Sequence, residues 1–148
     1  MKIALYGKAF GFDYDELMRD VLRQLKESSI EIVVYEPFLK DIIHCFEEDC
    51  EYQLFNGYEE IKDNADILFS FGGDGTILDS VPLIRDSGIP VLGINTGNLG
   101  FLASVSPKDT SVAVKNIIAG NYSVESRSLI QINDYNNVFN GINYALNE

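Results

Sequence analysis

The chain has 148 residues, 46% of them hydrophobic, which suffices for one domain with a sizeable core. Its formal net charge of −12, from 11 basic and 23 acidic residues, argues against binding of duplex nucleic acid, whose affinity depends on Lys and Arg contacts to phosphates. The apolar stretches are far shorter than a bilayer span, and residues 1–7 are too short and strand-like for a signal peptide. We therefore expect a cytoplasmic protein without membrane contact.

Short apolar runs alternate with amphipathic segments along most of the chain. The predicted elements, in chain order, are a strand at 2–6, a helix at 13–27, a strand at 30–35, a short helix at 37–46, an acidic connector at 47–51, a short helix at 58–64, a strand at 67–71, a helix at 76–86, a strand at 89–94 and a helix at 107–119. Because strands alternate with helices, we predict an α/β fold, with a Rossmann-like parallel sheet and helices on both faces.

Proline and glycine mark the ends of the later helices. Pro82 should kink the helix at 76–86 or shift its start, and Gly88 should end it. The helix at 107–119 has Pro107 at its expected first turn and Gly120 near its C-cap.

The two cysteines, Cys45 and Cys50, stand among acidic residues, with His44 beside the first. A zinc site would require four ligands with tighter pair spacing, so the sequence predicts reduced thiols in an acidic connector. We expect His44, the single histidine, to be a surface or packing residue.

The pattern changes after Gly120. Residues 122–132 and 138–146 alternate between apolar and polar side chains around a polar turn at 133–137, which predicts a β-hairpin. A hairpin alone is marginal in water. We therefore expect an α/β domain at residues 1–121 and, at 122–148, the first strands of a truncated all-β domain.

The most informative motif is Gly72-Gly73-Asp74-Gly75-Thr76, which follows a predicted strand and precedes a predicted helix. The glycines let the backbone approach a ligand closely, and the free N–H groups of a helix N-terminus favour a phosphate. A phosphate would normally repel a carboxylate beside it, so Asp74 suggests a chemical role, either accepting a proton from an attacking hydroxyl or helping to hold Mg²⁺. The alternative is a plain turn in which Asp74 caps the helix.

A second glycine-bearing segment, GINTGNLGFL at residues 93–102, begins within the next predicted strand and continues beyond its C-terminal end. Ligands bind at that end of the strands in open α/β sheets, so the two loops would face one crevice. The alternative is a long connection with turn glycines and a packed Phe101. Lys8, after the first strand, is a candidate cation for a phosphate or a solvated surface lysine.

Together these segments resemble the NAD kinase family, and the resemblance covers the whole chain. It rests on the motif at 72–76, the segment at 93–102, Tyr122 followed by Glu125 and Arg127, and the terminal ALNE at 145–148. The first motif is shared with diacylglycerol, sphingosine and 6-phosphofructo kinases. The second and the last are more particular to NAD kinases.

The resemblance implies transfer of the terminal phosphoryl group of ATP, or of polyphosphate, to the 2′-hydroxyl of the adenosine ribose of NAD, giving NADP. Mg²⁺ or another divalent cation such as Mn²⁺ would assist. Asp74 matches the family's proton acceptor. The other matching positions belong to the dinucleotide and phosphate site: Gly72, Gly73, Gly75, Leu78, Phe101, Asn147 and Glu148. Of these, Leu78 and Phe101 match positions that line the adenine pocket.

The resemblance also implies a homo-oligomer, a dimer or tetramer, when the protein is intact. Residues 122–148 would then open the β-rich domain that completes the NAD site, so we expect little or no kinase activity from this chain alone. Two alternatives remain at this point. One is a lipid or sugar kinase that shares the first motif, and the other is a non-catalytic nucleotide-binding domain.

Overall fold

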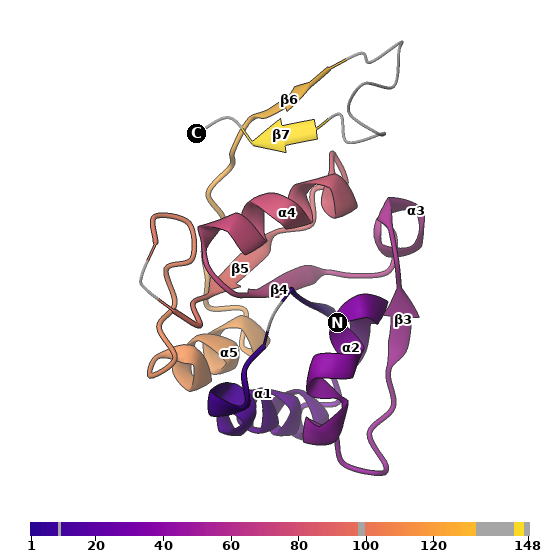
Figure 1. Ribbon diagram of the computed structural model, residues 1–148, viewed down its shortest axis with the longest axis vertical. Helices are drawn as coiled ribbons and strands as arrows, with labels where there is room; N and C mark the ends of the chain where they lie inside the picture. Colours follow the sequence, from indigo (N-terminus) through magenta and orange to yellow (C-terminus); the bar gives the residue numbers. More distant parts are fainter. Residues whose placement is uncertain (9, 98–99, 133–143, 147–148) are drawn as a thin grey trace.

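The computed structural model describes residues 1–8, 10–97, 100–132 and 144–146. A five-stranded parallel sheet has the order β3-β2-β1-β4-β5 and lies at the centre of the molecule (Figure 1). Its strands are β1 (Lys2–Gly7), β2 (Glu31–Tyr35), β3 (Gln53–Phe55), β4 (Ile67–Phe71) and β5 (Val91–Ile94). A separate antiparallel pair consists of β6 (Leu129–Gln131) and β7 (Tyr144–Leu146).

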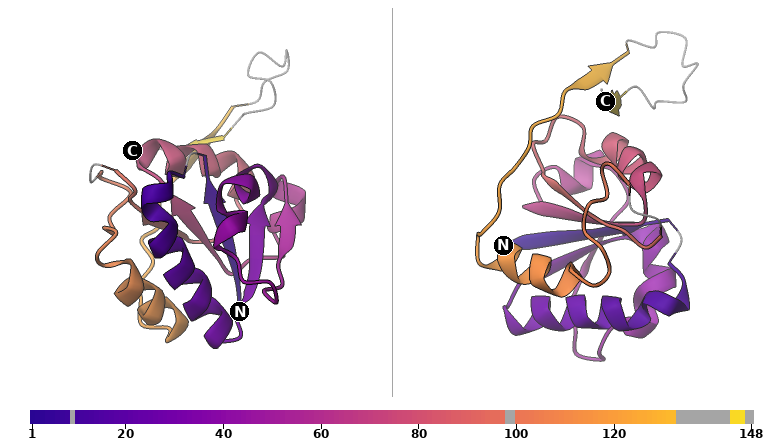
Figure 2. Two further views of the ribbon diagram at one scale, coloured as in Figure 1. Left: turned by 60° about the horizontal axis from the view of Figure 1, so that its bottom comes forward. Right: turned by 90° about the vertical axis from the view of Figure 1, so that its left-hand side faces the viewer.

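Helices cover both faces of the sheet, as Figure 2 also shows. They are α1 (Asp15–Glu27), α2 (Glu36–Ile42), α3 (Tyr58–Ile61), α4 (Asp74–Ile84) and α5 (Thr110–Ile118), with single 3₁₀ turns η1 (Phe12–Tyr14) and η2 (Ile43–Cys45). The helices α1, α2 and α5 pack on one face, and α3 and α4 on the other. The predicted Rossmann-like fold is therefore confirmed.

Alternating side chains of the strands explain how two cores form. In β1, Ile3 and Leu5 point toward α1, while Ala4 and Tyr6 point toward the opposite face. A parallel sheet with helices on both sides buries both of its faces, which is why its strands appear in the sequence as continuous apolar runs. The two cores therefore lie between the sheet and the helices on each of its faces.

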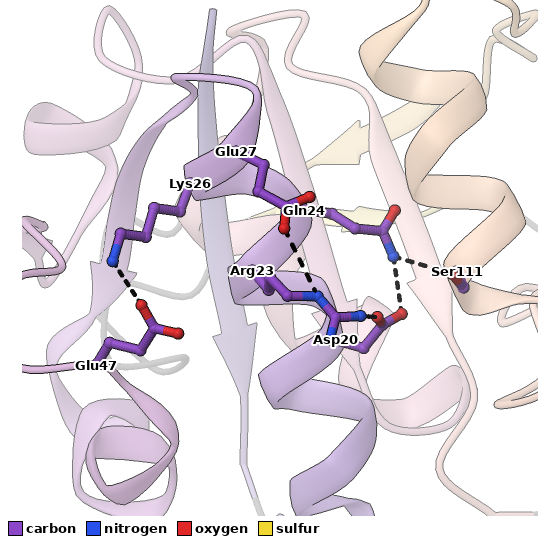
Figure 3. A network of polar contacts seen from close by, with 7 residues as sticks. All are labelled: Asp20, Arg23, Gln24, Lys26, Glu27, Glu47 and Ser111. Atoms are coloured by element: carbon purple, nitrogen blue, oxygen red, sulfur yellow. Dashed lines mark hydrogen bonds and ion pairs between the residues drawn. The ribbon is translucent and has the colours of Figure 1, made fainter.

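A polar network fastens α1 to its neighbours (Figure 3). Gln24 donates to Ser111 of α5 at 3.0 Å and to Asp20 at 2.8 Å. Lys26 pairs with Glu47 at 2.5 Å, from the connector that follows η2. Its hydrogen bonds to Asp49 and to Glu47 raise the pKa of Lys26. Polar side chains of α1 thus tie it to α5 and to the connector after η2, both of which come later in the chain.

The boundaries of α4 and α5 differ from those that proline and glycine predicted. The helix α4 begins at Asp74, two residues earlier than expected, and it ends at Ile84 because Arg85 takes a positive φ of 43°. Gly88, with φ 76°, lies in the following turn and does not end the helix. The helix α5 begins at Thr110, so Pro107 lies before its first turn.

Two further predictions need correction. The three-residue strand β3, at the edge of the sheet, was not expected, because so short a run carries no periodic signal. The expected strand at 122–132 is reduced to Leu129–Gln131, and the expected turn at 133–137 lies outside the described residues. The antiparallel pairing of β6 with β7 confirms a hairpin.

Within the part of the chain that the structure describes, none of the helices combines the length and the apolar character needed to cross a membrane.

Candidate functional site

The glycine motif forms a tight turn between β4 and α4. Gly72 has a φ of 153°, and a Cβ atom there would overlap the side chain of Thr76, so the turn itself requires glycine. The N–H of Gly72 donates to the carbonyl of Ile94 at 3.0 Å, which joins the motif to the end of the neighbouring strand β5. The N–H of Thr76 donates to the carbonyl of Gly73 at 3.0 Å and begins the helix.

Gly73 and Gly75 differ from Gly72. Neither has a positive φ, and a Cβ atom at either position would meet no atom within 4 Å. Neither the backbone conformation nor the packing of the chain therefore requires glycine there. A glycine in the first turn of a helix also costs stability relative to alanine. The bare backbone at these two positions leaves room for something outside the chain to approach it.

The carboxylate of Asp74 accepts hydrogen bonds from three consecutive backbone N–H groups, two at the end of the second glycine-bearing segment and one from the residue after it. Oδ2 accepts from Phe101 at 2.8 Å, and Oδ1 accepts from Leu102 at 3.0 Å and Ala103 at 2.9 Å. The hydrogen bonds from Ala103 and Phe101 lower the pKa of Asp74, and partial desolvation opposes them. Asp74 is therefore ionised at neutral pH and holds the two predicted motifs together.

The second segment is folded so that its end returns to Asp74. Val105 forms a parallel bridge with Ile94, and the N–H of Asn95 donates to the carbonyl of Val105 at 2.8 Å. Asn95 Oδ1 accepts from the N–H of Gly97 at 2.6 Å, which shapes the start of the loop. A Cβ atom on Gly100 would overlap the carboxylate of Asp74, so this glycine permits the close approach.

The order of the strands explains why these loops meet. The chain passes from β1 outward to β2 and β3, and from β4 outward to β5 in the other direction. The boundary between β1 and β4 is thus the switch point at which open α/β sheets bind their ligands. Lys8 follows β1 and Gly72 follows β4, so both lie at that boundary.

A cavity of about 510 Å³ opens beside α4. Its walls come from the ends of β1 and β2, from one face of α4 and from β7, and the lining residues are Tyr6, Lys8, Tyr35, Leu78, Asp79, Pro82, Leu83, Tyr144, Ala145 and Leu146. The ammonium of Lys8 lies 2.7 Å from the carboxylate of Asp79. Burial raises the pKa of Tyr6, and the charge of Asp79 adds to this effect.

The predicted site residues fall into three groups. Gly72, Gly73, Asp74 and Gly75 lie together at the start of α4, and the backbone of Phe101 meets them. The ring of Phe101 is 99% exposed, which contradicts the alternative of a packed side chain. Leu78 lines the cavity, one helical turn further along α4.

Asn147 and Glu148 lie outside the described residues, although the two residues before them line the cavity. Sequence reasoning missed Tyr6, Tyr35 and Asp79 as cavity residues. The sequence held one weak signal for the tyrosines. Both stand at the C-terminal ends of predicted strands, where ligands bind in open α/β sheets.

Known proteins match this chain in sequence. Residues 13–122 match the model of the ATP-NAD kinase N-terminal domain. The whole chain is 33% identical to an NAD kinase of Flavobacterium johnsoniae and 35% identical to one of Christiangramia forsetii, and it covers 51% of each. It thus spans about half the length of the curated relatives it matches.

A solved structure shares the fold. The yeast NADH kinase in complex with NADH superposes with a TM-score of 0.72 at 21% sequence identity, over 88% of this chain and 41% of the other. Since the family model matches about three quarters of the chain, from residue 13 to 122, the chain belongs to the NAD kinase family.

Proposed function

We propose that this chain carries the catalytic motif of an NAD kinase, which transfers the terminal phosphoryl group of ATP, or of polyphosphate, to the 2′-hydroxyl of the adenosine ribose of NAD. The observation that carries the proposal is the position of Asp74. Its ionised carboxylate lies between the glycine turn after β4 and the loop after β5, at the edge of the sheet where ligands bind.

Asp74 would act as the acceptor for the proton of the attacking hydroxyl. A ribose hydroxyl is a weak nucleophile, and such general-base help is typically worth ~10²–10⁴-fold in rate. Oδ2 accepts a single described hydrogen bond, from Phe101, so it keeps a lone pair for the substrate. The lowered pKa keeps the carboxylate ionised, and proton transfer to it would be completed only as the bond to phosphorus develops.

The proposed contacts of the other residues follow from their surroundings. The backbone at Gly73 and Gly75 is open on the outer side, so a phosphate could approach its N–H groups closely. The exposed ring of Phe101 and the 39% exposed Leu78 offer apolar surface to an adenine. Asn147 and Glu148 stay proposed contacts to the dinucleotide.

A divalent cation such as Mg²⁺ would neutralise charge on the transferred phosphoryl group when bound. Among the described residues, no group of three metal-ligating side chains gathers at Asp74. Mg²⁺ commonly uses one or two carboxylates together with substrate phosphates. We therefore propose that Asp74 or Asp79 contributes at most one ligand and that the nucleotide phosphates supply most of the others.

We also propose the two-part organisation, with an α/β nucleotide-binding domain at 1–121 and the start of a β-rich NAD-binding domain at 122–148. A cytoplasmic location and assembly as a dimer or tetramer, without nucleic acid or membrane partners, belong to the same proposal. Under this proposal the chain alone has little or no activity, because the relatives that the chain matches are about twice as long.

The decisive experiment supplies the other half of the enzyme. The 148-residue chain is assayed alone and as a fusion to the remaining half of the Flavobacterium johnsoniae NAD kinase, with NADP formation from NAD and ATP as the readout. We expect turnover by the fusion and little or none by the chain alone. A fusion that folds and binds NAD but forms no NADP would support a non-catalytic nucleotide-binding domain instead.

The same fusion tests the role of Asp74. We expect Asp74→Asn to lower kcat by ~10²–10⁴-fold while leaving the folded sheet intact by circular dichroism. Diacylglycerol and fructose 6-phosphate, offered in place of NAD, test the lipid and sugar kinase alternatives. Phosphorylation of either at a rate above that of NAD would overturn the assignment.

A further inference from the structure

We propose a second site, a binding site for Zn²⁺ or a similar transition metal ion, formed by Asp15, His44 and Cys45. One ligand atom from each of these residues lies within 4.8 Å of the other two. The imidazole Nε2 of His44 lies 2.8 Å from Asp15 Oδ2, and Cys45 Sγ lies 3.9 Å from the backbone oxygen of Asp15. The cluster joins the first turn of α1 to η2, on the face of the sheet opposite α4.

The donor set favours a borderline-soft metal ion. An imidazole nitrogen, a thiolate sulfur and a carboxylate oxygen are the three ligand types that Zn²⁺ uses in proteins, and hard ions such as Mg²⁺ avoid thiolate. Three protein ligands leave a fourth position for water. The His44 side chain is 36% exposed, which provides access for that water and for the ion.

One carboxylate oxygen in the cluster is buried without a hydrogen-bond donor in the described part of the chain. Asp15 Oδ1 is buried and has no hydrogen-bond partner among the described residues, whereas Oδ2 meets His44. A buried acceptor without a partner costs free energy. A metal ion between the three side chains would satisfy this carboxylate.

The surroundings hold the cluster in place before any ion arrives. Arg19 donates from Nη2 to the backbone carbonyl of His44 at 2.9 Å, and the Phe12 ring lies with its centroid 5.6 Å from that of His44. Cys45 is 3% exposed, in the core beneath α1. Binding would break the hydrogen bond between His44 and Asp15, and the thiol proton of Cys45 would pass to solvent as the thiolate coordinates the ion.

The spacing of Cys45 and Cys50 predicted reduced thiols without a zinc site. The fold adds a third ligand that the local sequence does not show. Asp15 precedes His44 by 29 residues in the chain, but α1 places it beside His44 and Cys45. The competing explanation is a surface ion pair beside a buried thiol, which binds no metal. The two explanations differ in one observable, sulfur–metal bonding at Cys45.

The test titrates the metal-free 148-residue chain with Co²⁺, whose thiolate complexes give a charge-transfer band in the near ultraviolet, and then with Zn²⁺ in competition. We expect one equivalent to bind, the band to appear, and Zn²⁺ to displace Co²⁺. Both His44→Gln and Asp15→Asn should weaken binding by at least about tenfold. Cys45→Ser should abolish the band, and Cys50→Ser, the matched control, should leave it unchanged.

Circular dichroism of each variant separates loss of a ligand from loss of the fold. His44→Gln changes an exposed side chain, so it keeps the proposal testable even if Cys45→Ser fails to fold. A band that is absent in the unmodified chain, that survives in Cys45→Ser, or that disappears in Cys50→Ser would overturn the proposal. So would affinity unchanged by His44→Gln. None of these results depends on kinase activity.

Discussion

At the scale of single residues, Asp74 is the position that connects sequence, structure and chemistry. Its place in the glycine motif was predictable, and so was the segment that faces it. Its actual partners were not, because they are backbone N–H groups of residues 101–103, which leave no side-chain signal in the sequence. The carboxylate therefore has a structural role, which is to hold two loops together, in addition to its proposed role as a proton acceptor.

The structural role of Asp74 predicts a response to pH. Backbone hydrogen bonds from Ala103 and Phe101 lower its pKa, so the stabilisation of the loop contact is complete above the unfolded value of about 3.9 and is lost only as pH falls through the lower folded value. In a two-dimensional NMR titration, the amide signals of residues 101–103 should shift together, with a midpoint below about 3.9. A midpoint above that value would show that the carboxylate is not held by these donors.

Gly100 offers a second test of this contact. Because a Cβ atom there would overlap the Asp74 carboxylate, Gly100→Ala should separate the loop from α4 and move the amide signals of Phe101 and Ala103. Gly97→Ala is the matched control, since its Cβ atom would lie at an ordinary 3.8 Å from Asn95 Oδ1. In the active fusion, we expect turnover to fall at least about tenfold for Gly100→Ala alone. Equal losses in both variants would mean that any side chain in this loop is disruptive.

At the scale of elements, prediction succeeded where a segment is long and buried. The strands β1, β2 and β4 follow from apolar runs because helices cover both of their faces. It failed at β3, which has three residues at the edge, and at the start of α4, where glycines conceal the first helical turn. The local sequence pattern therefore identified the sheet, but tertiary contacts determined where individual strands and helices begin and end.

The buried hydroxyl of Ser70 carries a desolvation cost inside β4, an interior strand of the sheet. Its side chain is fully buried, and its hydroxyl has no partner among the described residues, so Ser70→Ala removes a desolvation cost without breaking a hydrogen bond. We expect chemical denaturation to show an unchanged free energy of unfolding or a gain of about 1 kcal/mol.

The control for Ser70 is another buried hydroxyl that does have a partner. Thr110 donates to the carbonyl of Ser106 at 3.0 Å, so Thr110→Val should lower the free energy of unfolding by about 1 kcal/mol. A clear loss of stability in Ser70→Ala, comparable to that of Thr110→Val, would indicate that the Ser70 hydroxyl has a partner after all.

At the scale of the whole molecule, the charge of −12 constrains how a polyphosphate could be bound. Most cations of the described chain already face carboxylates, as Lys8 faces Asp79 and Lys26 faces Glu47 and Asp49. In the proposed function, local attraction for the phosphates would come from backbone N–H groups at the start of α4 and from a metal ion bound with the substrate. An acidic protein can bind a nucleotide in this way without a basic surface.

The hairpin is joined to the α/β part of the molecule through Arg85, whose guanidinium lies 4.7 Å from the Tyr58 ring centroid and 5.5 Å from that of Tyr144. Tyr58 belongs to α3 and Tyr144 to β7, so one cation bridges two elements that have no shared backbone hydrogen bonds. An exposed cation–π contact is worth about 0.5–1 kcal/mol. Removing the ring in Tyr144→Leu, which keeps apolar bulk against α4, should weaken the attachment by that amount.

Hydrogen exchange measures this attachment directly. In Tyr144→Leu we expect the amides of β6 and β7 to exchange roughly two- to fivefold faster, the factor that corresponds to 0.5–1 kcal/mol. The amides of β1 and β4, which are hydrogen-bonded within the buried sheet, serve as the internal control and should keep their rates. If the hairpin amides exchange at the original rate, the hairpin is held by the apolar contacts of β7 with α4, and Arg85 contributes nothing measurable. If all amides accelerate together, the substitution has destabilised the whole fold and the hairpin is not a separate unit.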